Sequence, residues 1–143
     1  MTRVGQNFGF PYCHANGIVD RDVKRDRACD GVALPVATMG PHAAAMGVHF
    51  YTGSMFPAEY RNTLLVARKG SWNRDQKFGY DVVAVRTDAN GGNARVSPFV
   101  TGFMNASDNS FWGRPVYMLQ LPDGSLLLSD EQMGAIYRIT YGG

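Results

Sequence analysis

Residues 64–67 (Leu-Leu-Val-Ala) and 126–129 (Leu-Leu-Leu-Ser) are two copies of one apolar strand, 62 residues apart in a chain of 143. Each copy follows a turn, at residues 60–62 and 122–124, and each precedes a polar loop and a Gly-led aromatic strand. A repeat of this length built from short strands is typical of a β-propeller blade, which cannot bury both of its faces alone. The sequence therefore predicts an all-β fold of about two propeller blades, whereas closed propellers typically have about 4–8.

Composition agrees with a globular chain of short strands. The sequence is 45% hydrophobic and 18% charged, and its 17 Gly, 7 Pro and 12% aromatic residues favour strands joined by tight turns. The net charge is only +2 and basic residues form no run, so we expect no nucleic-acid partner. No apolar stretch approaches the roughly 20 residues that span a bilayer, and the N-terminus lacks the apolar region of a signal peptide.

The expected strands divide the chain into three parts. Residues 1–40 are predicted to be an irregular entry segment, residues 41–104 one complete four-stranded antiparallel blade, and residues 105–143 a blade that ends after three strands. Two isolated blades would expose apolar faces and unpaired strand edges, so we expect either self-association or completion by missing blades. The strands are expected at residues 47–52, 63–68, 80–87, 95–103, 114–121, 125–129 and 135–141.

Blade topology predicts which end of the molecule carries the function. In an up-and-down blade, the loop between the second and third strands emerges at the same end as the connection to the next blade. Here these connections are the segment before Gly47, the long loop 69–79, the segment 105–113 and the turn 130–134, and binding residues concentrate on such loop-rich faces. The candidate ligand-binding residues on this face are His42, Lys69, Trp72, Asn73, Arg74, Trp112 and Arg114.

The aromatic and arginine pairs suit a flat anionic ligand. Trp72, Asn73 and Arg74 combine a stacking surface, an amide and a guanidinium that binds a carboxylate through two hydrogen bonds. Trp112 and Arg114 repeat this combination one blade later. The alternative is that both Trp side chains pack on the strands and that both Arg side chains pair with surface carboxylates.

Four other residues leave alternatives open. His42 is either a general base or hydrogen-bond donor, or an exposed loop residue. Lys69 either neutralises an oxyanion or is solvated at the loop mouth. Cys13 and Cys29 either form a disulfide, which would contribute about 3 kcal/mol on a chain-entropy estimate, or remain free thiols. The sequence contains no phosphate-binding loop, nucleophile elbow or zinc-ligand pattern.

Short motifs spread over nearly the whole chain occur together in a fixed order. They are NFGFPYC (7–13), GPHAA (40–44), FYTG (50–53), GSWNR (70–74), GY (79–80), WGRPV (112–116), DGSLL (123–127) and IYR (136–138). Together they resemble the C-terminal portion of the L-sorbosone dehydrogenase and soluble glucose dehydrogenase family, which includes the pyranose dehydrogenases. One departure is Lys69, which stands where members of that family often have a histidine.

The resemblance implies a six-bladed propeller that binds pyrroloquinoline quinone and calcium on its loop-rich face. Such enzymes oxidise a sugar hydroxyl or aldehyde by passing a hydride to the quinone. By analogy, Arg114 contacts the quinone, loop 69–74 lies over it, and Cys13 and Cys29 form the disulfide of a periplasmic or secreted enzyme. The family's catalytic histidine and calcium-binding segments lie upstream of the matching region, so no catalytic or metal-binding residue is expected in this chain.

Two hypotheses of different class follow. The leading one is that the chain is the C-terminal part of a quinone-dependent sugar dehydrogenase, inactive as an isolated monomer because catalytic segments are missing. The alternative is a non-catalytic binding or scaffold module, in which three two-blade chains close a six-bladed propeller. A lactonase propeller fits less well, because such sites need several acidic and Asn ligands and only Asp130 is suitably placed.

The repeat leads to a prediction about truncation. Ending the chain at Gly124 removes the last strands of the second blade, so the first blade loses the surface on which it packs. We expect loss of soluble expression, measured as the soluble fraction of the lysate next to the full chain. Unchanged solubility would mean that the two blades do not support one another.

Overall fold

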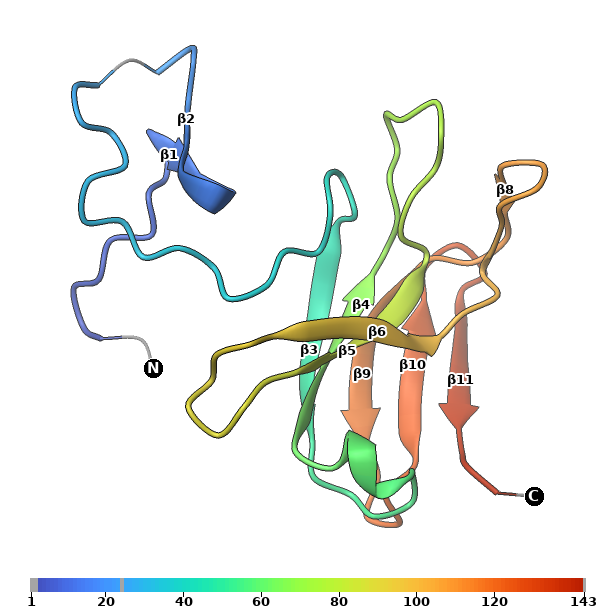
Figure 1. The fold of residues 1–143 in the computed structure, drawn as a ribbon. Coiled ribbons are helices and arrows are strands. Elements are labelled where there is room, and N and C mark those ends of the chain that lie inside the picture. The colour runs from blue at the N-terminus through green and yellow to red at the C-terminus, as the bar shows by residue number, and fades with distance from the viewer. Residues whose placement is uncertain (1–2, 24, 143) are drawn as a thin grey trace.

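The protein consists almost entirely of antiparallel strands, in a computed structural model that describes residues 3–23 and 25–142 (Figure 1). A four-stranded sheet has the order β3-β4-β5-β6, and a three-stranded sheet has the order β11-β10-β9. The first sheet comprises β3 (Ala45–Tyr51), β4 (Thr63–Arg68), β5 (Asp81–Arg86) and β6 (Arg95–Val100). The second comprises β9 (Pro115–Gln120), β10 (Leu126–Asp130) and β11 (Ala135–Ile139).

Short hairpins and 3₁₀ turns lie outside the two sheets. Two short hairpins are formed by β1 (Cys13–His14) with β2 (Ile18–Val19), and by β7 (Met104–Asn105) with β8 (Ser110–Phe111). Single 3₁₀ turns, η1 (Ala15–Gly17) and η2 (Ala58–Tyr60), are the remaining helical elements among the described residues. Neither hairpin was predicted from the sequence, because two-residue strands are too short to show an alternating pattern.

The predicted all-β fold is confirmed, and the seven expected strands are all present. The largest difference is at β6, which ends at Val100 and not at Phe103. Beyond Val100 the chain leaves the sheet, and the Phe103 side chain enters the core, where it is only 4% exposed. Burial of this aromatic ring therefore outweighs continuation of the strand.

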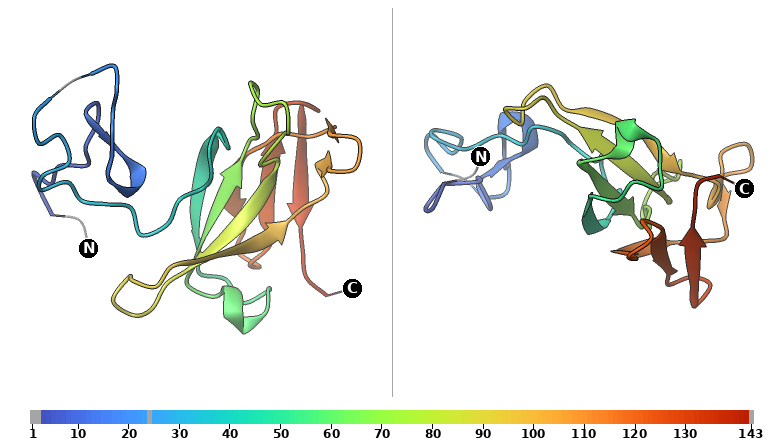
Figure 2. Two further views of the ribbon diagram at one scale, coloured as in Figure 1. Left: turned by 45° about the horizontal axis from the view of Figure 1, so that its top comes forward. Right: turned by 90° about the horizontal axis from the view of Figure 1, so that it is seen from below.

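The core lies between the two sheets. Because side chains alternate along a strand, the inner face of the first sheet presents Leu65 and Ala67 next to Val82 and Ala84 of β5. These residues pack against Met118, Leu126 and Leu128 from the second sheet, all at most 3% exposed. Figure 2 shows the two sheets lying side by side in both views.

The first strands of the two sheets, β3 and β9, come into contact at Gly47. A Cβ atom at this position would lie 2.4 Å from the Val116 carbonyl oxygen and 2.9 Å from the Tyr117 Cα atom. Both of those atoms belong to the backbone, which cannot move aside locally. A glycine is therefore required here for the sheets to pack at this distance.

Both outer faces of the pair of sheets are apolar. On the first sheet, Val48 and Phe50 are 61% and 54% exposed. On the second sheet, Tyr117, Leu119 and Ile136 are 62%, 55% and 70% exposed. Cross-strand pairing places Tyr117 and Ile136 beside Ser129 on one face, opposite to the core.

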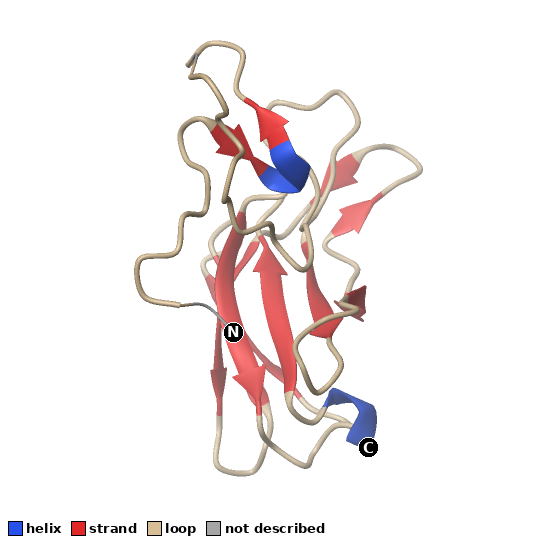
Figure 3. Ribbon diagram, turned by 60° about the vertical axis from the view of Figure 1, so that its left-hand side comes forward, coloured by secondary structure: helices blue, strands red, loops and turns tan. Residues whose placement is uncertain are grey.

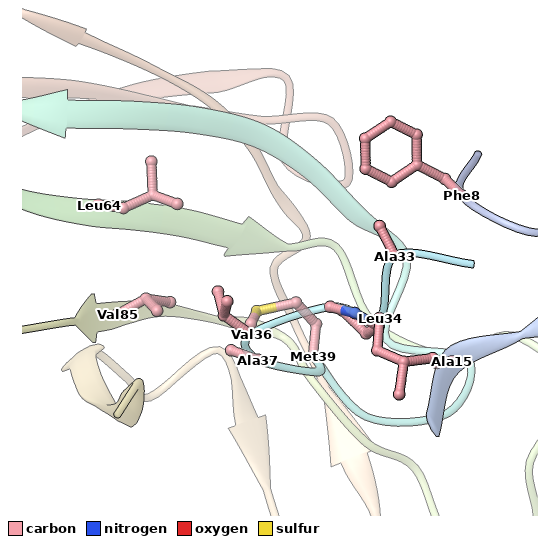
Figure 4. A pocket seen from close by; sticks show the side chains of 10 residues that line it. Phe8, Ala15, Ala33, Leu34, Val36, Ala37, Met39, Leu64 and Val85 are labelled. Atoms are coloured by element: carbon pink, nitrogen blue, oxygen red, sulfur yellow. The ribbon is translucent and has the colours of Figure 1, made fainter. Parts of the chain in front are cut away.

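The N-terminal segment is cross-linked and lies beyond the first sheet, away from the second (Figures 2 and 3). A disulfide joins Cys13 to Cys29. Residues 33–39 partly cover the outer face of the first sheet and leave an apolar cavity of about 510 Å³ against Leu64 and Val85 (Figure 4). The side chains that line this cavity are all apolar, so it is unsuited to an anionic ligand.

The Tyr51 hydroxyl ties three segments together inside the core. It donates a hydrogen bond to the Gly124 carbonyl at 2.9 Å and accepts bonds from the Met55 and Phe56 amides at 3.1 and 3.3 Å. We expect Tyr51→Phe to lower the free energy of unfolding by about 1–3 kcal/mol, because buried polar groups lose their partner. Urea denaturation measures this change. Tyr141→Phe, at an exposed position, is the control, and an equal loss in both variants would refute the role of the hydroxyl.

Candidate functional site

Three connections meet at one end of the two sheets, the end at which the long β4–β5 loop projects in Figure 1. Asn109, from the β7–β8 turn, accepts a hydrogen bond from the Lys77 amide at 2.8 Å and donates one to the Asp75 carbonyl at 2.5 Å. The Glu131 amide, in the β10–β11 turn, donates to the Arg114 carbonyl at 3.2 Å. The predicted loop-rich end therefore exists as a connected surface.

The base of the long loop is fixed where β4 ends and β5 begins. Arg68 and Asp81 are cross-strand partners, and their guanidinium and carboxylate form two hydrogen bonds of 2.7 and 2.5 Å. Beyond them, the Lys69 and Gly70 amides donate to the carbonyls of Ala44 and Ala43 at 3.0 and 2.9 Å. These bonds fix the backbone of Lys69 at the mouth of the loop.

Lys69, Arg114 and Glu131 form a compact cluster at this mouth, which we call the paired-cation site. The Arg114 guanidinium donates from Nε to the Lys69 carbonyl at 3.3 Å and from Nη2 to the Gly70 carbonyl at 3.2 Å. Its Nη1 lies 3.5 Å from Glu131 Oε1, and the Lys69 ammonium lies 2.7 Å from the same oxygen. One carboxylate oxygen is thus shared by two cations.

Both cations of the paired-cation site are largely shielded from water. Two cations face a single carboxylate, and the Arg114 and Lys69 side chains are only 19% and 24% exposed. The rings of Tyr80 and Phe111 lie 6.0 Å from the guanidinium carbon, at the limit of a cation–π contact. Partial removal from water strengthens the attraction of each cation for an anion.

Asp130 is the buried anchor that holds both sides of the site. It is 3% exposed, and its Oδ1 accepts hydrogen bonds from the Arg114 and Gln132 amides at 2.9 Å and from the Met133 amide at 3.2 Å. Its Oδ2 accepts a bond from the Tyr137 hydroxyl at 3.3 Å. Burial, together with the Asp130 carboxylate, raises the pKa of Tyr137. Asp130 therefore positions the Arg114 backbone and the turn that carries Glu131.

Gly113 allows this arrangement. A Cβ atom there would lie 2.4 Å from a ring carbon of Phe103 and 2.5 Å from Asp130 Oδ2. Any side chain would push the Asp130 carboxylate away from the Arg114 amide. The glycine that precedes Arg114 in the WGRPV motif is thus required for steric reasons.

Trp112 has both a packing role and an open surface. Its Nε1 donates to the Gly102 carbonyl at 2.6 Å, and its ring centroid lies 5.0 Å from that of Phe103 and 6.3 Å from that of Tyr137. The side chain is nevertheless 49% exposed. The alternative that the Trp112 side chain packs on the strands is therefore correct in part. Half of the indole nevertheless remains accessible to a ligand.

The other predicted site residues lie at the same end but outside the paired-cation site. Trp72 is 81% exposed, Asn73 is also exposed, and Arg74 donates from Nε to the Gln76 carbonyl at 3.2 Å. His42 is exposed, with a left-handed backbone (φ 58°). The structure brings Lys69 and Arg114 together and leaves Trp72, Asn73, Arg74 and His42 on the surrounding loops. Their roles in cofactor binding stay predictions.

Sequence reasoning missed Glu131 and Asn109. Glu131 follows Asp130 directly in a turn assigned to the binding end, and this position was the only available signal. Asn109 gives no such signal, because its partners, two backbone groups and the Gln76 side chain, lie more than 30 residues away. The carboxylate that pairs with Arg114 was anticipated only as a generic alternative.

The described residues, 3–23 and 25–142, contain neither a metal-ligand cluster nor a membrane-spanning helix. No group of three or more His, Cys, Asp or Glu side chains there is arranged to hold a metal ion. No helix among them has the length and apolarity that crossing a membrane requires.

The TrAA12-like family model matches residues 18–142, most of the chain. The chain belongs to this family. An uncharacterized protein of Borreliella burgdorferi is 35% identical over an alignment of 148 positions, which covers 99% of this chain and 38% of that protein. This chain thus spans well under half the length of that relative.

Solved structures show the same fold. A calcium structure of the Trichoderma reesei Carbohydrate-Active Enzymes Family AA12 protein is 20% identical, with a TM-score of 0.69 over 94% of this chain and 38% of that one. The holo form of the pyranose dehydrogenase PQQ domain from Coprinopsis cinerea is 26% identical, with a TM-score of 0.52 over 78% of this chain and 30% of that one. Both likenesses cover less than two fifths of the longer chain.

Proposed function

We propose that this chain is the quinone-facing part of a quinone-dependent sugar oxidoreductase and that it binds pyrroloquinoline quinone. The observation that carries the proposal is the paired-cation site, where Lys69 and Arg114 share one carboxylate at the loop-rich end. Membership in the TrAA12-like family and similarity to a pyranose dehydrogenase PQQ domain support it.

The residues present fit such a cofactor. Pyrroloquinoline quinone is flat and carries carboxylates, so Arg114 would bind a carboxylate or carbonyl oxygen and Lys69 a second anionic oxygen. The half-exposed Trp112 ring would cover part of its plane. When bound, the quinone supplies the hydride acceptor for oxidation of a sugar hydroxyl or aldehyde. This chain's own residues hold and orient it and partly exclude water.

The remaining features of the enzyme are assigned to segments outside this chain. We propose an aldose or a sorbosone-like aldehyde as substrate, with a catalytic base and calcium ligands on other blades. The Cys13–Cys29 disulfide fits an oxidising compartment, so we propose a periplasmic or secreted enzyme. The isolated chain should therefore reduce no dye with aldoses, even with quinone and calcium added.

Binding of the quinone by the purified chain tests the proposal. Isothermal titration calorimetry with pyrroloquinoline quinone, with and without calcium chloride, should show binding that Arg114→Met weakens about tenfold or more, since a charge-assisted hydrogen bond is lost. Arg95→Met removes an exposed arginine of β6 as the matched control. Absence of quinone binding by the wild-type chain, or equal loss in both variants, would contradict the assignment.

Self-association is the second candidate, favoured by the two apolar outer faces. The inner faces of the same two sheets already pack on each other, so each outer face suits another sheet of the same kind. For the purified chain, that sheet is supplied by a second copy, with Tyr117 and Ile136 of one copy against Val48 and Phe50 of the next. Because the two faces differ, the contact is head-to-tail, and three copies would complete six blades.

Light scattering coupled to gel filtration tests this association. We expect a trimer of the 15.7 kDa chain, and Ile136→Lys should return it to a monomer because a charge would be buried in the contact. Thr140→Lys adds the same charge at an exposed position just after β11. A monomeric wild-type chain would rule out this association.

A further inference from the structure

We propose that Glu131 is an internal counter-ion that occupies the anion position of the paired-cation site and is displaced when an anionic ligand binds. This inference rests on the proposed function, because it describes the resting state of the same site. Glu131 would then be a selectivity residue whose carboxylate competes with the ligand for Lys69 and Arg114.

The position of the Glu131 carboxylate is the first support. Its Oε1 lies between both cations, 2.7 Å from Lys69 Nζ and 3.5 Å from Arg114 Nη1. A ligand carboxylate that binds both cations at once needs this same position. Glu131 and such a ligand therefore exclude one another.

The cations stay in place when the carboxylate leaves, at least on the arginine side. The Arg114 guanidinium is held by the carbonyls of Lys69 and Gly70, and its backbone amide by Asp130. None of these three bonds involves Glu131. The guanidinium is thus pre-organised for an anion whether or not Glu131 is bound to it.

The Glu131 side chain is free to move outward. It is 41% exposed, about twice as much as either cation, and lies in a turn whose next residues are exposed as well. Its backbone amide remains bonded to the Arg114 carbonyl, so a change of side-chain rotamer is sufficient. Displacing the side chain costs little, because ion pairs between partly exposed side chains contribute little to stability.

Competition by Glu131 has a consequence for selectivity. A ligand that carries a single carboxylate gains nothing beyond the ion pairs that Glu131 already makes. Such a ligand also loses translational freedom when it binds. A flat ligand with several anionic oxygens makes contacts beyond those replaced. The internal carboxylate therefore discriminates against small monoanions and leaves the site to polyanionic ligands.

The test is Glu131→Gln, which keeps the shape of the side chain and removes its charge. Glu59→Gln is the matched control, because Glu59 pairs with Arg86 at 3.6 Å and lies in η2, away from the paired-cation site, so the same net charge is lost. Calorimetry uses two probes, pyrroloquinoline quinone and benzene-1,3,5-tricarboxylate. Both should bind Glu131→Gln about threefold to tenfold more tightly than the wild type, the effect of one to two partly exposed ion pairs. Glu59→Gln should match the wild type, and urea midpoints check that each variant folds.

The outcomes separate this inference from the proposed function. If the quinone binds the wild type and Glu131→Gln equally, or binds the variant more weakly, Glu131 is not a competitor, although quinone binding stands. If only the tricarboxylate binds, and binds the variant more tightly, the counter-ion role of Glu131 is supported and the quinone assignment fails. If neither probe binds either protein, both are overturned.

Discussion

The packing of the inner faces of the two sheets determines the position of everything else in this molecule. Leu65 and Ala67 of one sheet pack against Leu126 and Leu128 of the other, and Gly47 lets strands β3 and β9 approach to backbone contact. With this packing, the ends of β4 and β10 lie at the same level. The Arg114 side chain then reaches the backbone carbonyls of Lys69 and Gly70, which are some 45 residues away in sequence.

Polar interactions at that end follow a hierarchy of burial. Asp130 is almost fully buried and satisfied by four donors, so it serves as a fixed structural anion. Glu131, the next residue, is exposed and shares its charge between two less exposed cations. Two adjacent acidic residues thus have different physical roles. The buried one fixes the turn, and the exposed one is exchangeable with solvent or a ligand.

The family resemblance and the fold lead to the same view of the chain's surroundings. This chain corresponds to less than two fifths of each of the three longer relatives described above. Its outer faces at Val48 and Ile136 are apolar like the inner faces, and the edge of β11 pairs with no strand among the described residues. These surfaces suit a stack in which every sheet lies between two others. Completion of that stack and assembly of the paired-cation site are therefore linked, because both depend on how the sheets are aligned.

The sequence alone determined the all-β class, the seven main strands, the turns between them and the end that carries the long loops. Those features depend on the alternation of apolar and polar residues and on turn residues, and both patterns can be recognised within about ten positions. It also singled out Arg114 and Lys69 by residue type. Only the tertiary structure decided that these two cations share the Glu131 carboxylate, that Asp130 holds both sides, and that Phe103 leaves its strand for the core. Such pairings join residues far apart in sequence, and their geometry exists only once the two sheets have packed.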